Sequence, residues 1–127
     1  MTAILLVFVG AGIGGVLRHL IGLQSIRLIG TGFPAGTLAI NVLGSLLIGL
    51  LAGWFAFRGG AGWSAQARLF LMTGVLGGFT TFSSFSLDFA LLIERNEIGL
   101  AALYAIASVG LSFLGVFAGL ALMRSLA

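Results

Sequence analysis

Long apolar runs separated by short polar stretches dominate the pattern along this chain. The runs cover about residues 3–23, 36–57, 67–93 and 99–123. A helix that crosses the hydrocarbon core of a bilayer needs about 20 predominantly apolar residues, so each run can make one crossing. Backbone polar groups in lipid must be bonded internally, which favours helices. The pattern predicts an all-α integral membrane protein with four transmembrane helices.

The predicted connections are short and carry residue types that favour helix ends. Proline suits the first turn of a helix, tryptophan the membrane interface, and arginine can extend its charge toward water. The boundary features are Arg18 and His19 near the end of the first run, a loop at 24–33, Pro34 before the second run, residues 58–62 after it, Trp63, the charged stretch 94–97 and Arg124.

Glycine pairs at four-residue spacing occur in every predicted helix. Glycine at this spacing lets helix backbones approach closely in a membrane, which favours a densely packed assembly. The pairs are Gly10 and Gly14, Gly49 and Gly53, Gly74 and Gly78, and Gly115 and Gly119.

Composition supports lipid as the main solvent of the chain. Hydrophobic residues make up 60% of the 127 positions and charged residues only 7%, too few to cover a water-facing surface. The net charge of +3 comes from six arginines and three acids, so no polybasic surface for nucleic acid is expected. There is no cysteine for thiolate chemistry. We expect one transmembrane domain over residues 1–127, with no separate soluble domain.

The arginines are divided evenly between the two predicted sides of the membrane. Arg58, Arg68 and Arg124 fall on one side, and Arg18, Arg27 and Arg95 on the other. An excess of basic residues in short loops normally sets the orientation of insertion, so an even division favours neither. Insertion in both orientations would allow an antiparallel dimer with its two-fold axis in the membrane plane. The same balance also arises by chance in a fraction of sequences with so few charges.

The most informative segment is Gly-Gly-Phe-Thr-Thr-Phe-Ser-Ser-Phe-Ser at 77–86, in the middle of the third run. Paired glycines followed by paired threonines propagate a helix poorly, so we expect a break near residues 77–81. Freed backbone in lipid must be bonded by protein, water or an ion, and discontinuous helices therefore often surround ion sites. The alternative is a glycine kink whose hydroxyls bond back to the preceding turn, and five hydroxyls within 80–86 make it the weaker account.

Polar side chains also recur at helical spacing in the second and fourth runs. Tyr104, Ser108 and Ser112 share one helical face over about 12 Å, at 1.5 Å per residue. Thr37 and Asn41 share a face in the same way. Each set alone is typical of contacts between helices. Together they form a lane of uncharged donors without acidic partners, which suits a small anion, and aromatic ring edges nearby could add weak attraction.

These residues resemble the Fluc/CrcB family of fluoride channels. The resemblance extends over all four predicted helices, and its most specific parts are residues 77–86, Gly-Thr-Leu-Ala-Ile-Asn at 36–41 and the face of Tyr104, Ser108 and Ser112. The sequence departs from the family pattern at Ser84, Asp88 and His19. Threonine, glutamate and an aromatic residue are commoner there.

The resemblance implies a dual-topology antiparallel homodimer with two parallel fluoride pathways in the bacterial plasma (inner) membrane. It implies a structural sodium ion at the dimer centre, held by backbone carbonyls of Gly77 and Thr80, and ring edges of Phe82 and Phe85 beside fluoride. Arg18 corresponds to the arginine of an anion-attracting vestibule. The predicted fluoride pathway comprises Arg18, Thr37, Asn41, Thr81, Phe82, Ser83, Phe85, Tyr104, Ser108 and Ser112.

The predicted function is passive export of fluoride, which confers fluoride resistance. A membrane potential is worth about 2.3 kcal/mol per elementary charge per 100 mV, so no nucleotide is needed. A proton-coupled multidrug exporter would need a buried carboxylate, and the three acids, Asp88, Glu94 and Glu97, all lie in or beside the late third run. A scaffold protein would leave the hydroxyl cluster unexplained. No acid, base or nucleophile constellation predicts an enzyme.

Overall fold

The computed structural model describes residues 1–57 and 64–126, and in this part of the chain four stretches are long and apolar enough to cross a membrane. The continuous helices are α1 (Thr2–Ile29), α2 (Ala35–Phe57) and α6 (Ile98–Leu126). The third stretch consists of α3 (Ser64–Arg68), the π-helix η1 (Leu69–Leu76), α4 (Gly77–Phe79) and α5 (Phe82–Glu94). The predicted four-helix, all-α chain with an interrupted third helix is confirmed.

The first helix is longer than predicted. Residues 24–29, expected in a loop, continue α1 to Ile29, because this segment contains neither glycine nor proline to stop a helix. The helix ends at Gly30, whose φ of 93° suits glycine and whose N–H donates to the carbonyl of Ile26. Arg18 and His19 therefore lie well inside the helix. Pro34 immediately precedes α2, as predicted.

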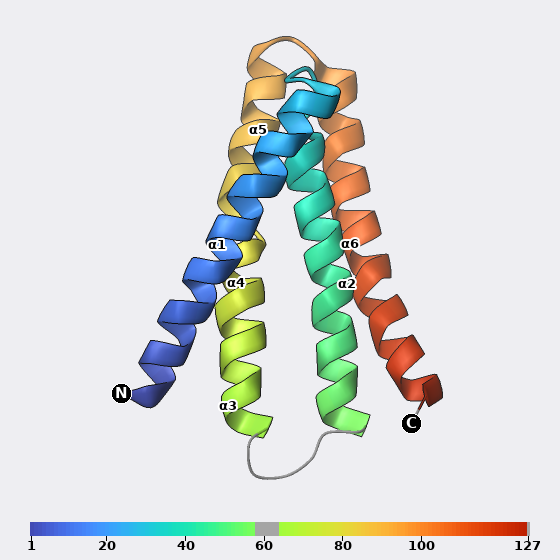
Figure 1. Ribbon diagram of the computed structural model, residues 1–127. Helices are drawn as coiled ribbons and strands as arrows, with labels where there is room; N and C mark the ends of the chain where they lie inside the picture. Colours follow the sequence, from blue (N-terminus) through green and yellow to red (C-terminus); the bar gives the residue numbers. More distant parts are fainter. Residues whose placement is uncertain (58–63, 127) are drawn as a thin grey trace.

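One pair of helices is formed by α1 and the first part of the third span (Figure 1). A Cβ atom added at Gly10 would lie 2.6 Å from the carbonyl oxygen of Phe70. Cβ atoms at Gly14 and Gly78 would overlap the carbonyl oxygens of Val75 and Ala11. Only glycine allows this backbone contact, so the predicted close packing is confirmed for these pairs.

The second pair is formed by α2 and α6, and close backbone contacts at glycines hold it together as well. A Cβ atom at Gly119 would lie 2.5 Å from the amide nitrogen of Leu50, and one at Gly49 would overlap the carbonyl oxygen of Val116. Gly115 lies against Leu46. Two tightly joined helix pairs, together with α5, therefore make up the described fold.

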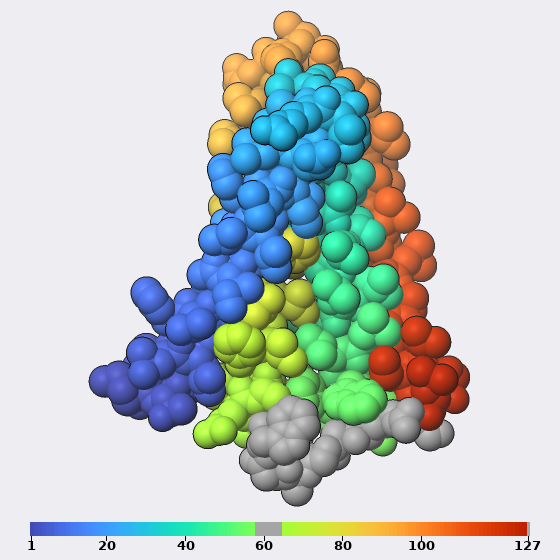
Figure 2. Space-filling view, viewed as in Figure 1, coloured from blue at the N-terminus to red at the C-terminus, as the bar shows by residue number. Residues whose placement is uncertain are grey.

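The two pairs converge at one end of the molecule and diverge toward the end that carries both termini (Figures 1 and 2). Leu92, Ala101 and Tyr104 form a fully buried cluster in the convergent half. The turn between α5 and α6 includes Asn96 with a φ of 60°, a conformation that asparagine tolerates better than most residues. At the divergent end, Arg68 and Arg124 lie over the rings of Phe55 and Phe57. The predicted segment 58–62 and the predicted anchor Trp63 lie outside the described residues.

Candidate functional site

The break in the third helix lies at two threonines. Thr80 and Thr81 have extended backbones, with ψ angles of 157° and 120°, whereas Gly77 and Gly78 remain helical. Thr81 then caps α5, because its Oγ1 accepts the Ser84 amide at 3.1 Å. A break within residues 77–81 is confirmed, and the structure places it at the threonine end of that range.

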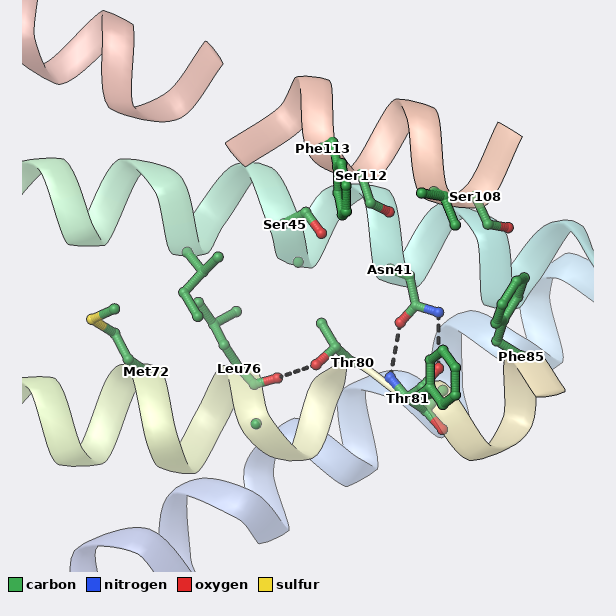
Figure 3. A pocket seen from close by; sticks show the side chains of 15 residues that line it. Asn41, Ser45, Met72, Leu76, Thr80, Thr81, Phe85, Ser108, Ser112 and Phe113 are labelled. Carbon is green, nitrogen blue, oxygen red and sulfur yellow. Dashed lines mark hydrogen bonds between the residues drawn. The ribbon is translucent and has the colours of Figure 1, made fainter. Parts of the chain in front are cut away.

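Asn41 of α2 binds both backbone groups of Thr81 (Figure 3). Its Nδ2 donates to the Thr81 carbonyl oxygen at 2.9 Å, and its Oδ1 accepts the Thr81 amide at 2.8 Å. Asn41 Oδ1 thus replaces the partner that the Thr81 amide would have in an unbroken helix. Asn41 Nδ2 adds a second donor to the Thr81 carbonyl, which as the N-cap of α5 accepts the first bond of that helix. One N–H of Asn41 is left for another acceptor.

The break also deprives two carbonyls, those of Gly77 and Thr80, of the amide donors that a continuous α-helix would give them. The Thr81 amide, four residues after Gly77, bonds to Asn41, and the Ser84 amide, four residues after Thr80, bonds to the Thr81 hydroxyl. The carbonyls of Gly77 and Thr80 therefore lose their helical partners. Both residues line the central cavity described below.

The alternative of hydroxyls that bond back to the helix accounts for only part of the cluster. Thr80 Oγ1 donates to the Leu76 carbonyl and Ser86 Oγ to the Phe82 carbonyl. Thr81 instead caps α5, and its hydroxyl lies 3.3 Å from that of Ser83. Back-bonding thus coexists with a true interruption of the backbone.

A cavity of about 500 Å³ lies between the two helix pairs and runs past the break. Its wall is mainly apolar, and no charged residue of the described chain lines it. The predicted site residues that line it are Asn41, Gly77, Thr80, Thr81, Phe82, Phe85, Ser108 and Ser112 (Figure 3). An uncharged cavity with hydroxyl and amide donors is suited to a small anion.

Two aromatic rings from α5 flank this cavity. The centroids of Phe82 and Phe85 lie 5.7 Å apart with the planes tilted by 54°. Phe82 begins α5 and is 78% exposed, although it lies in the middle of the third span. Its ring therefore projects from the side of the single chain.

Tyr104 lies behind the cavity wall rather than on it. The residue is fully buried, its hydroxyl donates to Asp88 Oδ2 at 3.1 Å, and its ring contacts those of Phe33 and Phe85. Asp88, although shorter than the glutamate that is commoner at this position in the family, accepts a hydrogen bond from a hydroxyl on α6.

A second cavity, of about 430 Å³, lies toward the convergent end. Thr37, His19 and Asp88 are among the residues that line it. Tyr104 and Phe85 therefore stand between this cavity and the central one, since Asp88 bonds to Tyr104 and Phe85 lines the central wall.

Two predicted pathway residues lie away from these cavities. Ser83 is exposed near the cap of α5. Arg18 lies on α1, and its Nε is buried without a hydrogen-bond partner among the described residues. Within residues 1–57 and 64–126 there is also no group of three or more His, Cys, Asp or Glu side chains that could hold a metal ion.

The structure adds lining residues that the sequence pattern did not single out. They are Gly44, Ser45, Ile48, Met72, Leu76, Val109 and Phe113. Ser45 could have been found, because it continues the four-residue spacing of Thr37 and Asn41. The apolar members carried no such signal. A Cβ at Gly44 would overlap Thr80 Cγ2, so glycine is needed there to seat the break against α2.

Comparisons with known proteins agree over almost the whole chain. The family described as CrcB-like protein, Camphor Resistance (CrcB), matches residues 5–120. A protein of Rhodopseudomonas palustris (strain BisB5) named fluoride-specific ion channel FluC is 60% identical over 96% of this chain and 97% of its own length. Fluoride-specific ion channel FluC 2 of Nitrobacter hamburgensis is 62% identical with the same coverage. FluC of Novosphingobium aromaticivorans is 56% identical over the full length of both chains.

Proposed function

The chain belongs to the family of CrcB-like proteins, and we propose that it is a fluoride-selective channel that exports cytoplasmic fluoride by passive electrodiffusion. The family is one of ion channels and not of enzymes. With its four spanning helices, the chain is a multi-pass protein of the bacterial inner membrane.

The central cavity is the observation that best supports this proposal. It combines an apolar wall with uncharged donors from Asn41, Thr81, Ser108 and Ser112, and no carboxylate of the described chain lines it. Hydroxyl and amide protons can replace part of the hydration shell of a small anion that accepts strong hydrogen bonds. The edges of the Phe82 and Phe85 rings carry partial positive charge and add attraction.

We propose that the working channel is an antiparallel homodimer. The extended backbone at Thr80 and Thr81 and the projecting Phe82 lie on an open side of the single chain. Irregular backbone at membrane depth is tolerated only where protein or a water-filled cavity covers it. A second copy inserted in the opposite orientation supplies this cover, and the even division of the arginines allows both orientations. Two copies contain two fluoride pathways.

A sodium ion at the dimer centre fits the donors that the break offers. The carbonyl oxygens of Gly77 and Thr80 lose their helical donors because Thr81 and Ser84 bond elsewhere. Carbonyl oxygen is a suitable ligand for a hard cation, and a second copy doubles the number of ligands. The ion would neutralise the dipoles of four carbonyls and hold the two breaks together.

Fluoride flux from liposomes tests the proposal. Purified protein should release fluoride rapidly when a potential drives it and release chloride much more slowly. Phe82→Ile keeps an apolar side chain but removes the ring edge, and it should lower fluoride flux by about tenfold. Phe117→Ile is the matched control, because Phe117 is an exposed phenylalanine of α6 that lines neither the central nor the second cavity, and it should conduct normally. Folded wild-type protein that releases no fluoride would refute the channel function.

A further inference from the structure

The second cavity joins the connection between α1 and α2 to the polar face of α2. Gly30 and Pro34 line it at the convergent end, and His19 lines it about 16 Å back along α1, at 1.5 Å per residue. Thr37 of α2 and Asp88 of α5 line it as well. His19 is exposed, so its imidazole can exchange protons with water in this cavity.

Few charged groups lie around His19. The segments in closest contact with α1 are α2, η1 and α4, and they contain no charged residue. Among the described residues that line the second cavity, Asp88 is the only other titratable one. Asp88 also shares a third cavity, of about 310 Å³, with Arg95. Arg18 and Arg27 lie on α1 itself but do not line the second cavity.

The charge on the imidazole acts on the route that an anion takes to the central cavity. From the convergent end this route passes Thr37 and Asp88 and then Tyr104, whose hydroxyl bonds to Asp88. The Asp88 carboxylate repels an anion, and a protonated His19 in the same cavity offsets that charge. Imidazole is the side chain that ordinarily changes its charge between pH 5 and 8. The electrostatic barrier at this end therefore falls as the solution becomes more acidic.

We propose that protonation of His19 eases the entry of fluoride into the second cavity, so that the protein conducts fluoride faster in acid than in alkaline solution. This inference rests on the proposed channel function and deepens it, because it adds regulation by pH to the same pathway. The response belongs to this chain and not to the family pattern, since the aromatic residue that is commoner at position 19 has no charge to change. Acid also converts part of the external fluoride into neutral hydrogen fluoride, which crosses lipid. Export is then fastest when fluoride enters fastest.

Fluoride flux from liposomes at about pH 6 and about pH 8, with the same pH on both sides, tests this regulation. The ratio of flux in acid to flux in alkali should be about three or more in the wild type, because one positive charge in a partly hydrated cavity attracts an anion moderately. His19→Gln removes the titratable group and should lower this ratio to about one. His19→Arg is charged at both pH values, so its ratio should also be about one, with a higher flux in alkali than His19→Gln.

A relocated histidine is the matched control. In the double variant His19→Gln/Gln24→His the imidazole moves to a position on α1 that lines neither the central nor the second cavity. The ratio should stay near one, because the charge then lies outside the route of the anion. Protein-free liposomes at each pH correct for hydrogen fluoride that crosses the lipid.

The outcomes separate this inference from the proposed function. If the wild type conducts fluoride equally well at both pH values, the regulation does not exist although the channel does. A ratio that stays high in His19→Gln would also overturn the inference, because another group, such as Asp88, would then be titrating. A wild type without fluoride flux at either pH would refute the channel function and the regulation with it. Each ratio compares one preparation with itself, so a difference in the amount of folded protein between variants cancels.

Discussion

The two halves of the third span are held in place by different forces. The half before the break, up to Phe79, packs on α1 through backbone contacts at Gly10, Gly14 and Gly78. The half after it is fixed by hydrogen bonds, from Asn41 to Thr81, from Ser84 to Thr81 and from Tyr104 to Asp88. Shape positions the first half and polar groups position the second.

The difference shows how a polar site can be built in a membrane. Glycine contacts need no polar atoms, so they anchor one half where lipid surrounds the helix. Polar contacts hold the half after the break, and those at Thr81 also decide which backbone groups are free to face the cavity. The two halves should therefore respond differently to substitution.

The largest effect is expected from Gly14→Leu. A side chain there would overlap the Val75 carbonyl oxygen, and overpacking of a backbone contact costs about 3 kcal/mol or more. We expect almost no monodisperse protein by gel filtration after extraction from the membrane. Gly12→Leu, where nothing lies within 4 Å of an added Cβ, should extract normally. Equal yields of both variants would contradict placement by shape.

Asn41→Ala should have the next largest effect. It leaves the Thr81 amide without a partner and removes one donor to the Thr81 carbonyl, and an unsatisfied buried amide costs about 1–3 kcal/mol. Folded protein should still be obtained, with fluoride flux about a hundredfold lower in liposomes, since the break loses its seat on α2. Gln66→Ala, an exposed amide of α3, serves as the control. Normal flux in Asn41→Ala would show that the break keeps its geometry without the hydrogen bonds from Asn41.

Thr81→Val tests the cap of α5 alone. The substitution keeps a β-branched shape and removes the acceptor of the Ser84 amide, which costs about 1 kcal/mol for a typical cap. The thermal midpoint of the purified protein should fall by a few degrees. Thr81→Ser retains the acceptor and should melt close to wild type. A midpoint unchanged by valine would mean that the cap adds nothing.

The smallest effect is expected from Tyr104→Phe. The ring keeps its contacts with Phe33 and Phe85, while the hydrogen bond from its hydroxyl to Asp88 is lost. Hydrogen bonds between membrane helices contribute about 0.6 kcal/mol on average. A double-mutant cycle with Asp88→Ala, which removes the acceptor, should return a coupling energy of this size. If the effects of the two substitutions on the free energy of unfolding were strictly additive, the contact between Tyr104 and Asp88 would contribute no coupling energy.

The sequence predicted the spans and the break because both follow from local composition. Runs of apolar residues define the helices, and Thr80 and Thr81 are poor helix formers beside two glycines. The end of α1 was missed because hydropathy falls at Gln24 while helix propensity does not. The helix therefore continues until Gly30 ends it.

The partners within the site could not be derived from spacing. Thr37 and Asn41 share a face of α2, yet Asn41 bonds to Thr81 forty residues away and Thr37 lines another cavity. Tyr104 shares the face of Ser108 but lies behind the cavity wall, because Asp88 binds its hydroxyl. Such assignments depend on how helices distant in sequence are packed.

The π-helix η1 has a consequence for how the chain tolerates insertions and deletions. A π turn bonds each residue to the one five positions away, so it holds one more residue than an α turn. One residue gained or lost within 69–76 can thus be absorbed as a change between α and π winding. The segment after it keeps its rotational phase, and Gly78 and Thr81 keep their partners. The length of the third span can therefore vary by one residue over evolution without the break turning away from Asn41.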